Sequence, residues 1–170
     1  MDILPNSMSF RFVTTLVVEG DDDIPADFTG RVRTSTNGVL ESVAWFNRGE
    51  LEDPGPRTPA YSRYRSDGAV KQVRHYRLGR LHDPAPGFPA VQGFYANGAR
   101  RYEEHFRYGR RHDSGGRPAI VKWRLDGSVR VELHYYEGLR IEMIDPAPRA
   151  RHPATSVSPI SARSAPSAAV

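Results

Sequence analysis

Cysteine is absent from this sequence, which excludes disulfide bonds, thiolate zinc sites and cysteine nucleophiles. Lysine is scarce too: Lys71 and Lys122 are the only two among 24 basic residues, and the rest are arginine. No apolar run approaches the roughly 18 residues of a membrane-spanning helix. A secretory signal is not recognised either, because Asp2 stands where a basic region is expected and Arg11 interrupts the apolar stretch 10–18. We therefore expect a cytoplasmic protein.

Known catalytic signatures are missing as well. The sequence contains no Gly-x-Ser-x-Gly, no P-loop, no Gly-x-Gly-x-x-Gly and no His-Glu-x-x-His. Glu103 and Glu104 are adjacent, so on a strand their carboxylates point to opposite faces and cannot act as a pair. We expect no enzyme, with no catalytic, cofactor-binding or metal-binding residues.

The composition indicates a thin structure whose charge is unevenly distributed along the chain. The chain has 170 residues, enough for one domain, but a mean hydropathy of −0.58 and only 38% hydrophobic residues. The net charge of +4 is uneven: residues 1–29 carry −5, residues 30–144 carry +7 and residues 145–170 carry +2. Such a basic body is compatible with ordinary surface variation or with the binding of a polyanion.

Three markers repeat through the sequence with a period of about 30 residues. Asn/Asp-Gly pairs fall at steps of 30, 30 and 29, and a second glycine follows each pair at the same steps. A Pro-Ala pair closes three of the units. The markers are Asn37-Gly38, Asp67-Gly68, Asn97-Gly98 and Asp126-Gly127; Gly49, Gly79, Gly109 and Gly138; and Pro59-Ala60, Pro89-Ala90 and Pro118-Ala119. A shared period of this length predicts a stacked repeat architecture.

The pattern inside each unit predicts an all-β fold, an elongated antiparallel β-meander sheet of about four 30-residue hairpin repeats. We expect an N-terminal β segment at 1–33 that caps the sheet, with strands at 10–19 and 28–33. The four-unit repeat domain follows at 34–144. Residues 145–170 are rich in Pro, Ala and Ser, and we expect a disordered tail there.

Strand alternation predicts a core face and a solvent-facing face. The core face would hold Leu40, Ala44, Phe46, Val70, Tyr76, Tyr102, Phe106, Val129, Val131, Leu133 and Tyr135. At the Asn/Asp-Gly turns we expect three-residue loops, because these pair Tyr64 with Val70 and bring Tyr64, Phe94 and Trp123 to the core face. At the second turns we also favour three-residue loops, because a two-residue turn would force Arg48, Leu78, Tyr108 and Glu137 to positive φ.

One stretch resembles a known repeat family. Gly79-Arg80-Leu81-His82-Asp83 is followed by Pro89-Ala90 and Tyr95-Ala96-Asn97-Gly98, and the units that begin at Gly49 and Gly109 repeat much of this. The stretch is similar to the MORN-variant repeats of bacterial, phage and large-virus proteins, including YwqK-type antitoxins, over about 34–143. That resemblance implies an elongated antiparallel sheet that acts in protein interaction or toxin neutralisation. A Pro-rich insert at 83–88 departs from the family pattern.

The candidate interaction face is the solvent-facing one. Its residues are Trp45, His75, His105, His134, Arg101 and Arg130. Equivalent histidines of neighbouring units would lie roughly 10 Å apart, too far to share a metal ion. Only His75 with His82, or His105 with His112, could meet, and only across a two-residue turn.

Three functions remain open. The first is a non-enzymatic interaction module, phage-derived or antitoxin-like, that contacts a protein partner. The second is a polyanion binder with Arg on phosphates and rings on bases. The third is a structural subunit of a phage or secretion assembly that recruits neighbours through an exposed edge strand.

Overall fold

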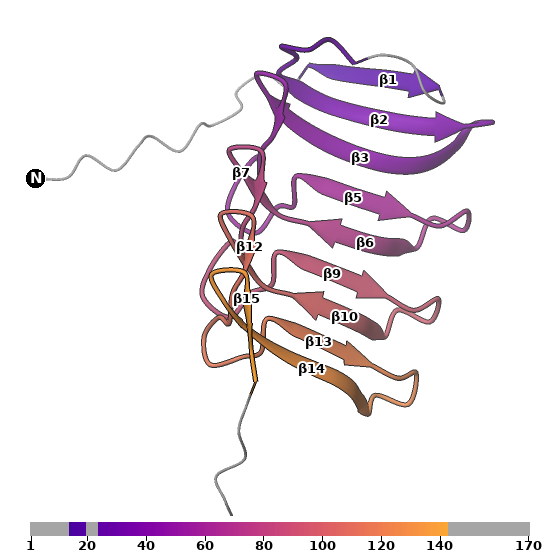
Figure 1. The fold of residues 1–170 in the computed structure, drawn as a ribbon. Helices are drawn as coiled ribbons and strands as arrows, with labels where there is room; N and C mark the ends of the chain where they lie inside the picture. Colours follow the sequence, from indigo (N-terminus) through magenta and orange to yellow (C-terminus); the bar gives the residue numbers. More distant parts are fainter. Residues whose placement is uncertain (1–13, 20–23, 143–170) are drawn as a thin grey trace, which may run out of the picture.

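The computed structural model describes residues 14–19 and 24–142, and within them it is all-β (Figure 1). The strands are β1 (Thr15–Glu19), β2 (Gly30–Thr36), β3 (Val39–Asn47), β4 (Glu50–Leu51), β5 (Tyr61–Tyr64), β6 (Val70–Arg74), β7 (Tyr76–Arg77), β8 (Arg80–Leu81), β9 (Val91–Phe94), β10 (Arg100–Glu104), β11 (Phe106–Arg107), β12 (Arg110–Arg111), β13 (Ile120–Trp123), β14 (Val129–Tyr136) and β15 (Leu139–Ile141). No helix in this part of the chain is long and apolar enough to cross a membrane.

One large sheet runs through the units in the order β1-β2-β3-β5-β6-β9-β10-β13-β14-β15, with β4 paired to β3. Its pairs are antiparallel except that β1 runs parallel to β2. The short hairpins β7–β8 and β11–β12 stand beside this sheet and stack along one side of the molecule (Figure 1). The predicted all-β hairpin fold is confirmed. Residues 10–13 of the first expected strand and the expected tail 145–170 lie outside the described residues.

The loops at Asp67-Gly68, Asn97-Gly98 and Asp126-Gly127 have the predicted three residues. In the first of them Tyr64 pairs with Val70, Arg65 and Ala69 are joined by a hydrogen bond, and Gly68 has a φ of 83°. A β-bulge follows each loop, and it leaves one extra residue on the second strand. The first unit differs, because Asn37 and Gly38 form a two-residue turn between Thr36 and Val39.

The three-residue loops expected at the second turns are wrong. Tyr76 pairs with Leu81 and Arg77 with Arg80, so only Leu78 and Gly79 remain in the turn. Both residues have positive φ, as a turn that matches the right-handed twist of its strands requires. The neighbouring unit secures this geometry, since Leu78 N–H donates to Glu52 Oε2 over 2.7 Å and Gly79 N–H to the Leu51 carbonyl over 3.1 Å.

Among the described residues, the predicted core face forms a cluster of buried apolar residues at the N-terminal end. Val18, Val32 and Ala44 are buried there, and Phe28 and Phe46, which meet each other edge-to-face, pack against this cluster. In later units the same face carries Gln72 and Arg74, then Tyr102 and Glu104, and it is hollowed. Phe94 and Val70 do not join it: they line a separate cavity of about 450 Å³ together with Val73 and His75.

Pro-rich loops cover the face that was expected to meet solvent. The loops at 53–60, 83–90 and 113–119 lie against one another; Arg57 sits over the Phe88 ring at 5.2 Å, and Gly87 N–H donates to Ser114 Oγ. Arg57 and Pro59 line the cavity beside His75. This cover explains why Glu103 is only 3% exposed.

Candidate functional site

An Asp–His pair joins each unit to the next. Asp83 Oδ1 accepts backbone hydrogen bonds from Ala90 and Phe106, both over 2.9 Å, and its Oδ2 meets Nδ1 of His105 at 2.7 Å. The equivalent sets are Asp53 with Ala60, Tyr76 and His75, and Asp113 with Ala119, Tyr135 and His134. One carboxylate thus closes its own Pro-rich loop and holds the next strand. We call these three sets the Asp–His latches.

The latches bury two histidines that were predicted to face solvent. His105 is fully buried and His75 is 7% exposed, so that prediction is wrong for both. With Asp83 on Nδ1, the other ring nitrogen of His105 has no hydrogen-bond partner among the described residues. The sequence did carry a signal for the latches: Asp53, Asp83 and Asp113 precede the histidines by 22, 22 and 21 positions.

The third latch, Asp113 with His134, is the most exposed to solvent, and the ionisation of its carboxyl follows from its hydrogen bonds. Burial favours the neutral form of Asp113, but hydrogen bonds from Tyr135 N–H, His134 and Ala119 N–H outweigh it and lower the pKa of this carboxyl. Asp113 is therefore ionised at neutral pH. An anion bonded in this way holds β14 on the preceding unit.

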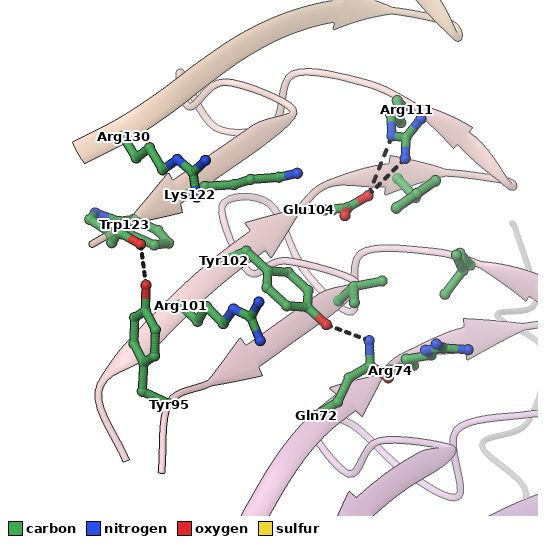
Figure 2. A pocket seen from close by; sticks show the side chains of 13 residues that line it. Gln72, Arg74, Tyr95, Arg101, Tyr102, Glu104, Arg111, Lys122, Trp123 and Arg130 are labelled. Carbon is green, nitrogen blue, oxygen red and sulfur yellow. Dashed lines mark hydrogen bonds and ion pairs between the residues drawn. The ribbon is translucent and has the colours of Figure 1, made fainter. Parts of the chain in front are cut away.

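The opposite face of the sheet carries the candidate site. It is a hollow of about 690 Å³ that spans the second to fourth units, and we call it the basic hollow (Figure 2). Its walls are formed by Gln72, Arg74, Leu81, Val91, Tyr95, Arg101, Tyr102, Glu104, Phe106, Arg111, Lys122, Trp123 and Arg130. Because Gln72, Arg74, Tyr102 and Glu104 alternate with latch-side residues, the hollow and the latches occupy opposite faces.

Five cationic side chains face one acidic side chain in the basic hollow. Glu104 is already satisfied, since Arg111 donates to its Oε2 from both Nε, at 3.3 Å, and Nη2, at 3.1 Å. Arg101, Lys122 and Arg130 are exposed and form no ion pair with any described residue. Arg101 and Arg130 are the extra residues of their bulges, which is how the backbone turns both into the hollow.

The aromatic rings of the hollow are fixed by hydrogen bonds and by guanidinium groups. Tyr95 donates from its hydroxyl to the Trp123 carbonyl over 2.8 Å, and Gln72 donates to the Tyr102 hydroxyl over 2.6 Å (Figure 2). Arg101 lies over the Tyr95 ring at 5.8 Å and Arg100 over the Trp123 ring at 5.4 Å. These contacts fix the positions of the rings within the hollow.

The six predicted interaction residues do not form one surface. Arg101 and Arg130 line the basic hollow, whereas His75 and His105 are buried in latches on the other face. His134 is partly buried in the third latch, and Trp45 belongs to the first unit, with Arg31 over its ring at 5.6 Å. Sequence reasoning did not bring Lys122, Tyr95 and Tyr102 into the site, because it took the face that holds Tyr102 as an apolar core.

The two-residue turns allow the remaining histidine pairs to be tested as metal ligands. His82 packs on the Tyr108 ring at 4.6 Å, and its Nδ1 accepts a hydrogen bond from Tyr108 N–H over 3.2 Å. His75 is bonded to Asp53 instead. Among the described residues no group of three or more His, Cys, Asp or Glu side chains is placed to hold a metal ion.

Burial lowers the pKa of His82, and the positive charges of Arg77 and Arg107 lower it further, against the opposing effects of Asp83 and Asp53. The neutral ring is the form that can accept the hydrogen bond of Tyr108. His82 thus acts as a backbone cap for the next turn.

Comparisons with protein-family models, with curated proteins and with solved structures each found no match. The likeness to MORN-variant repeats therefore stays a prediction from the sequence motifs.

Proposed function

We propose that this protein is a non-enzymatic β-repeat interaction module and that the basic hollow contacts a protein partner. The supporting observation is the set of three exposed cations, Arg101, Lys122 and Arg130, which have no acidic partner in the described chain and converge on one pre-formed surface. Like charges held together in this way favour an oppositely charged surface that neutralises them.

The latches support this surface from the opposite face of the sheet. Asp83, for example, accepts hydrogen bonds from Ala90 N–H and Phe106 N–H and meets His105 Nδ1, so it holds the backbone next to β9, β10 and β11 from behind. A surface that is already ordered loses little entropy when a partner binds. The resemblance to MORN-variant repeats points the same way, and an antitoxin-like or phage-derived role is the biological setting that we propose for it.

Site-specific photo-cross-linking tests this function. A benzophenone amino acid at Arg101 should give an adduct in cells whose size nuclease treatment does not change. The same group at Val17, which is exposed on β1 and lies outside the hollow, is the matched control. A position-independent adduct pattern, or none at all at Arg101, would contradict the proposal.

Nucleic-acid binding is the second candidate, because Arg, Lys, Trp and Tyr side chains line one surface. The positive charges of the hollow favour nucleic-acid binding, but its aromatic rings favour it less. Guanidinium groups already lie over Tyr95, Trp123 and Phe106, and therefore compete for the ring faces that bases would need. A nuclease-sensitive adduct at Arg101, with retention on heparin that falls steeply with salt, would favour this candidate.

A structural subunit is the third candidate, and β14 is the element that favours it. Strand β10 pairs on one side with β9 and on the other with β13, whereas the part of β14 equivalent to residues 102–104 pairs only with β13 among the described strands. Light scattering tests this candidate, which predicts concentration-dependent assembly.

A further inference from the structure

We propose that the segment bound in the basic hollow is an extended acidic peptide whose Glu or Asp side chains are spaced two residues apart. This inference rests on the proposed function, and it names the chemistry of the partner. Its basis is the arrangement of the cations on three adjacent strands: Arg101 on β10, Lys122 on β13 and Arg130 on β14.

The spacing of the strands sets the spacing of the acids. Neighbouring strands lie about 4.8 Å apart, so β10 and β14 are separated by roughly 10 Å, with β13 between them. An extended chain rises about 3.3 Å per residue and turns every second side chain to the same side, so acids two residues apart face the hollow together and span roughly 7 Å. A peptide that crosses the strands can therefore place successive carboxylates on Arg101 and Arg130, with Lys122 between.

The chemistry of the walls favours carboxylates on a peptide. Arginine binds a carboxylate through two parallel hydrogen bonds, and Arg111 already binds Glu104 in a related manner within the hollow. Leu81, Val91 and Phe106 add apolar wall to the same hollow, which suits aliphatic residues that alternate with the acids. Basic segments are excluded, because five cations would repel them.

The chain itself contains an acidic stretch, Glu19-Gly20-Asp21-Asp22-Asp23, so a second copy is a competing occupant. Glu19 ends β1 at the opposite end of the strand order from β14. Binding of this stretch would make the protein associate with itself, and a peptide titration at low protein concentration separates the two cases.

Fluorescence of Trp123 provides the measurement. The chain has two tryptophans, and Trp45→Phe leaves Trp123, which lines the hollow, as the sole reporter. The probe is a synthetic peptide of about twelve residues that alternates Glu and Val. Two comparison ligands are its Gln-for-Glu version and oligothymidylate of similar length.

We expect saturable binding of the Glu peptide that weakens as salt is added, and no measurable binding of the Gln peptide. Arg101→Glu combined with Arg130→Glu should weaken binding about tenfold or more, because two attractive contacts become repulsive. Arg33→Glu is the matched control: Arg33 is an exposed β2 residue outside the hollow, and its reversal should change affinity less than about twofold. Thermal unfolding of each variant verifies that the fold is kept.

Equal binding of the Gln peptide, an equal loss in Arg33→Glu, or tighter binding of oligothymidylate would each overturn the inference. So would self-association that is lost when Asp21, Asp22 and Asp23 become Asn, because the occupant would then be a second copy. A protein cross-linked at Arg101 whose contact segment has no acids would sink this inference and leave the proposed function standing. A nucleic-acid adduct would overturn both.

Discussion

The first unit and the later units are built on the same hairpin, yet different interactions hold them together. Around β1–β3, Val18, Val32 and Ala44 form a small apolar core against Phe28 and Phe46. From the second unit on, the equivalent face opens into the basic hollow, and the Asp–His latches on the other face carry the connection between units. Moving the stabilising contacts to one face leaves the other face free to bind.

The largest expected effect tests whether a latch stabilises the later units in the way that the apolar core stabilises the first unit. Asp83→Ala leaves the buried His105 and two backbone N–H groups without their acceptor, so we expect the free energy of unfolding to fall by about 3–5 kcal/mol. Urea unfolding measures it. The matched control is Asp67→Ala, whose carboxylate accepts only the Ala69 N–H in an exposed turn, with an expected loss below about 1 kcal/mol. Equal losses would mean that the latch is not a principal connection.

The apolar end should respond less to a single change. Val32 is 1% exposed, and Val32→Ala should lower the free energy of unfolding by about 1–2 kcal/mol through lost contacts and a residual cavity. Val17→Ala, at a largely exposed position of the adjoining strand, should change it by less than about 0.5 kcal/mol. If Val32→Ala cost more than Asp83→Ala, the ranking of core and latch would be reversed.

A smaller and opposite effect is expected at the second turns. Leu78 is exposed and has a φ of 50°, a region that costs a branched residue roughly 1–2 kcal/mol and that Asn tolerates better. Leu78→Asn should therefore raise the melting temperature, by an amount that corresponds to about 0.5–1 kcal/mol. Leu139→Asn is the control, since Leu139 is similarly exposed but lies on β15 without positive φ. A gain at both positions would point to surface polarity and not to the turn.

The smallest effect concerns pH and compares two turns. Glu52 caps the turn at Leu78 and His82 caps the one at Tyr108. Because the folded pKa of His82 lies below its ordinary value near 6.5, its contribution is complete above that pH and is lost as the pH falls through the lowered folded value. Hydrogen exchange at the Tyr108 amide should therefore lose protection between neutral and mildly acidic pH, while the Leu78 amide keeps it.

His82→Gln is the variant that checks the assignment. It should abolish the difference in pH dependence between the Tyr108 and Leu78 amides, because glutamine does not titrate. Should both amides lose protection together in the unmodified protein, the change would reflect general unfolding and not the cap.

The parts of this fold that depend on period were predictable from the sequence. Spaced glycines and Pro-Ala pairs located the hairpins, and the pairing of Tyr64 with Val70 followed from burying an aromatic residue. The second turns were not predictable from local cost alone. Leu78 accepts positive φ because Glu52 and Leu51 of the preceding unit hold its turn, and this contact is long-range.

Strand alternation also failed for the site, for two physical reasons. It assumed that the sheet has one bare face, whereas the Pro-rich loops cover the face with His75 and His105. It also took each strand as regular, whereas bulges turn Arg101 and Arg130 toward the opposite side. The recurring Asp before each histidine was the overlooked signal, since an acid at a fixed place in every unit indicates a structural bond.

Each latch takes its Asp from one unit and its His from the next, so a unit is complete only when it has a successor. Chain length is therefore adjustable in whole units. Removing residues 64–93 would join Arg63 to Phe94 and set Asp53 opposite His105 at the original separation of 22 positions, because one period has been removed. Such a shortened protein would keep the same pattern of latches and would lose the part of the basic hollow that the removed unit supplies. The fixed Asp–His separation therefore allows the length of the molecule to change by whole units without a change of fold.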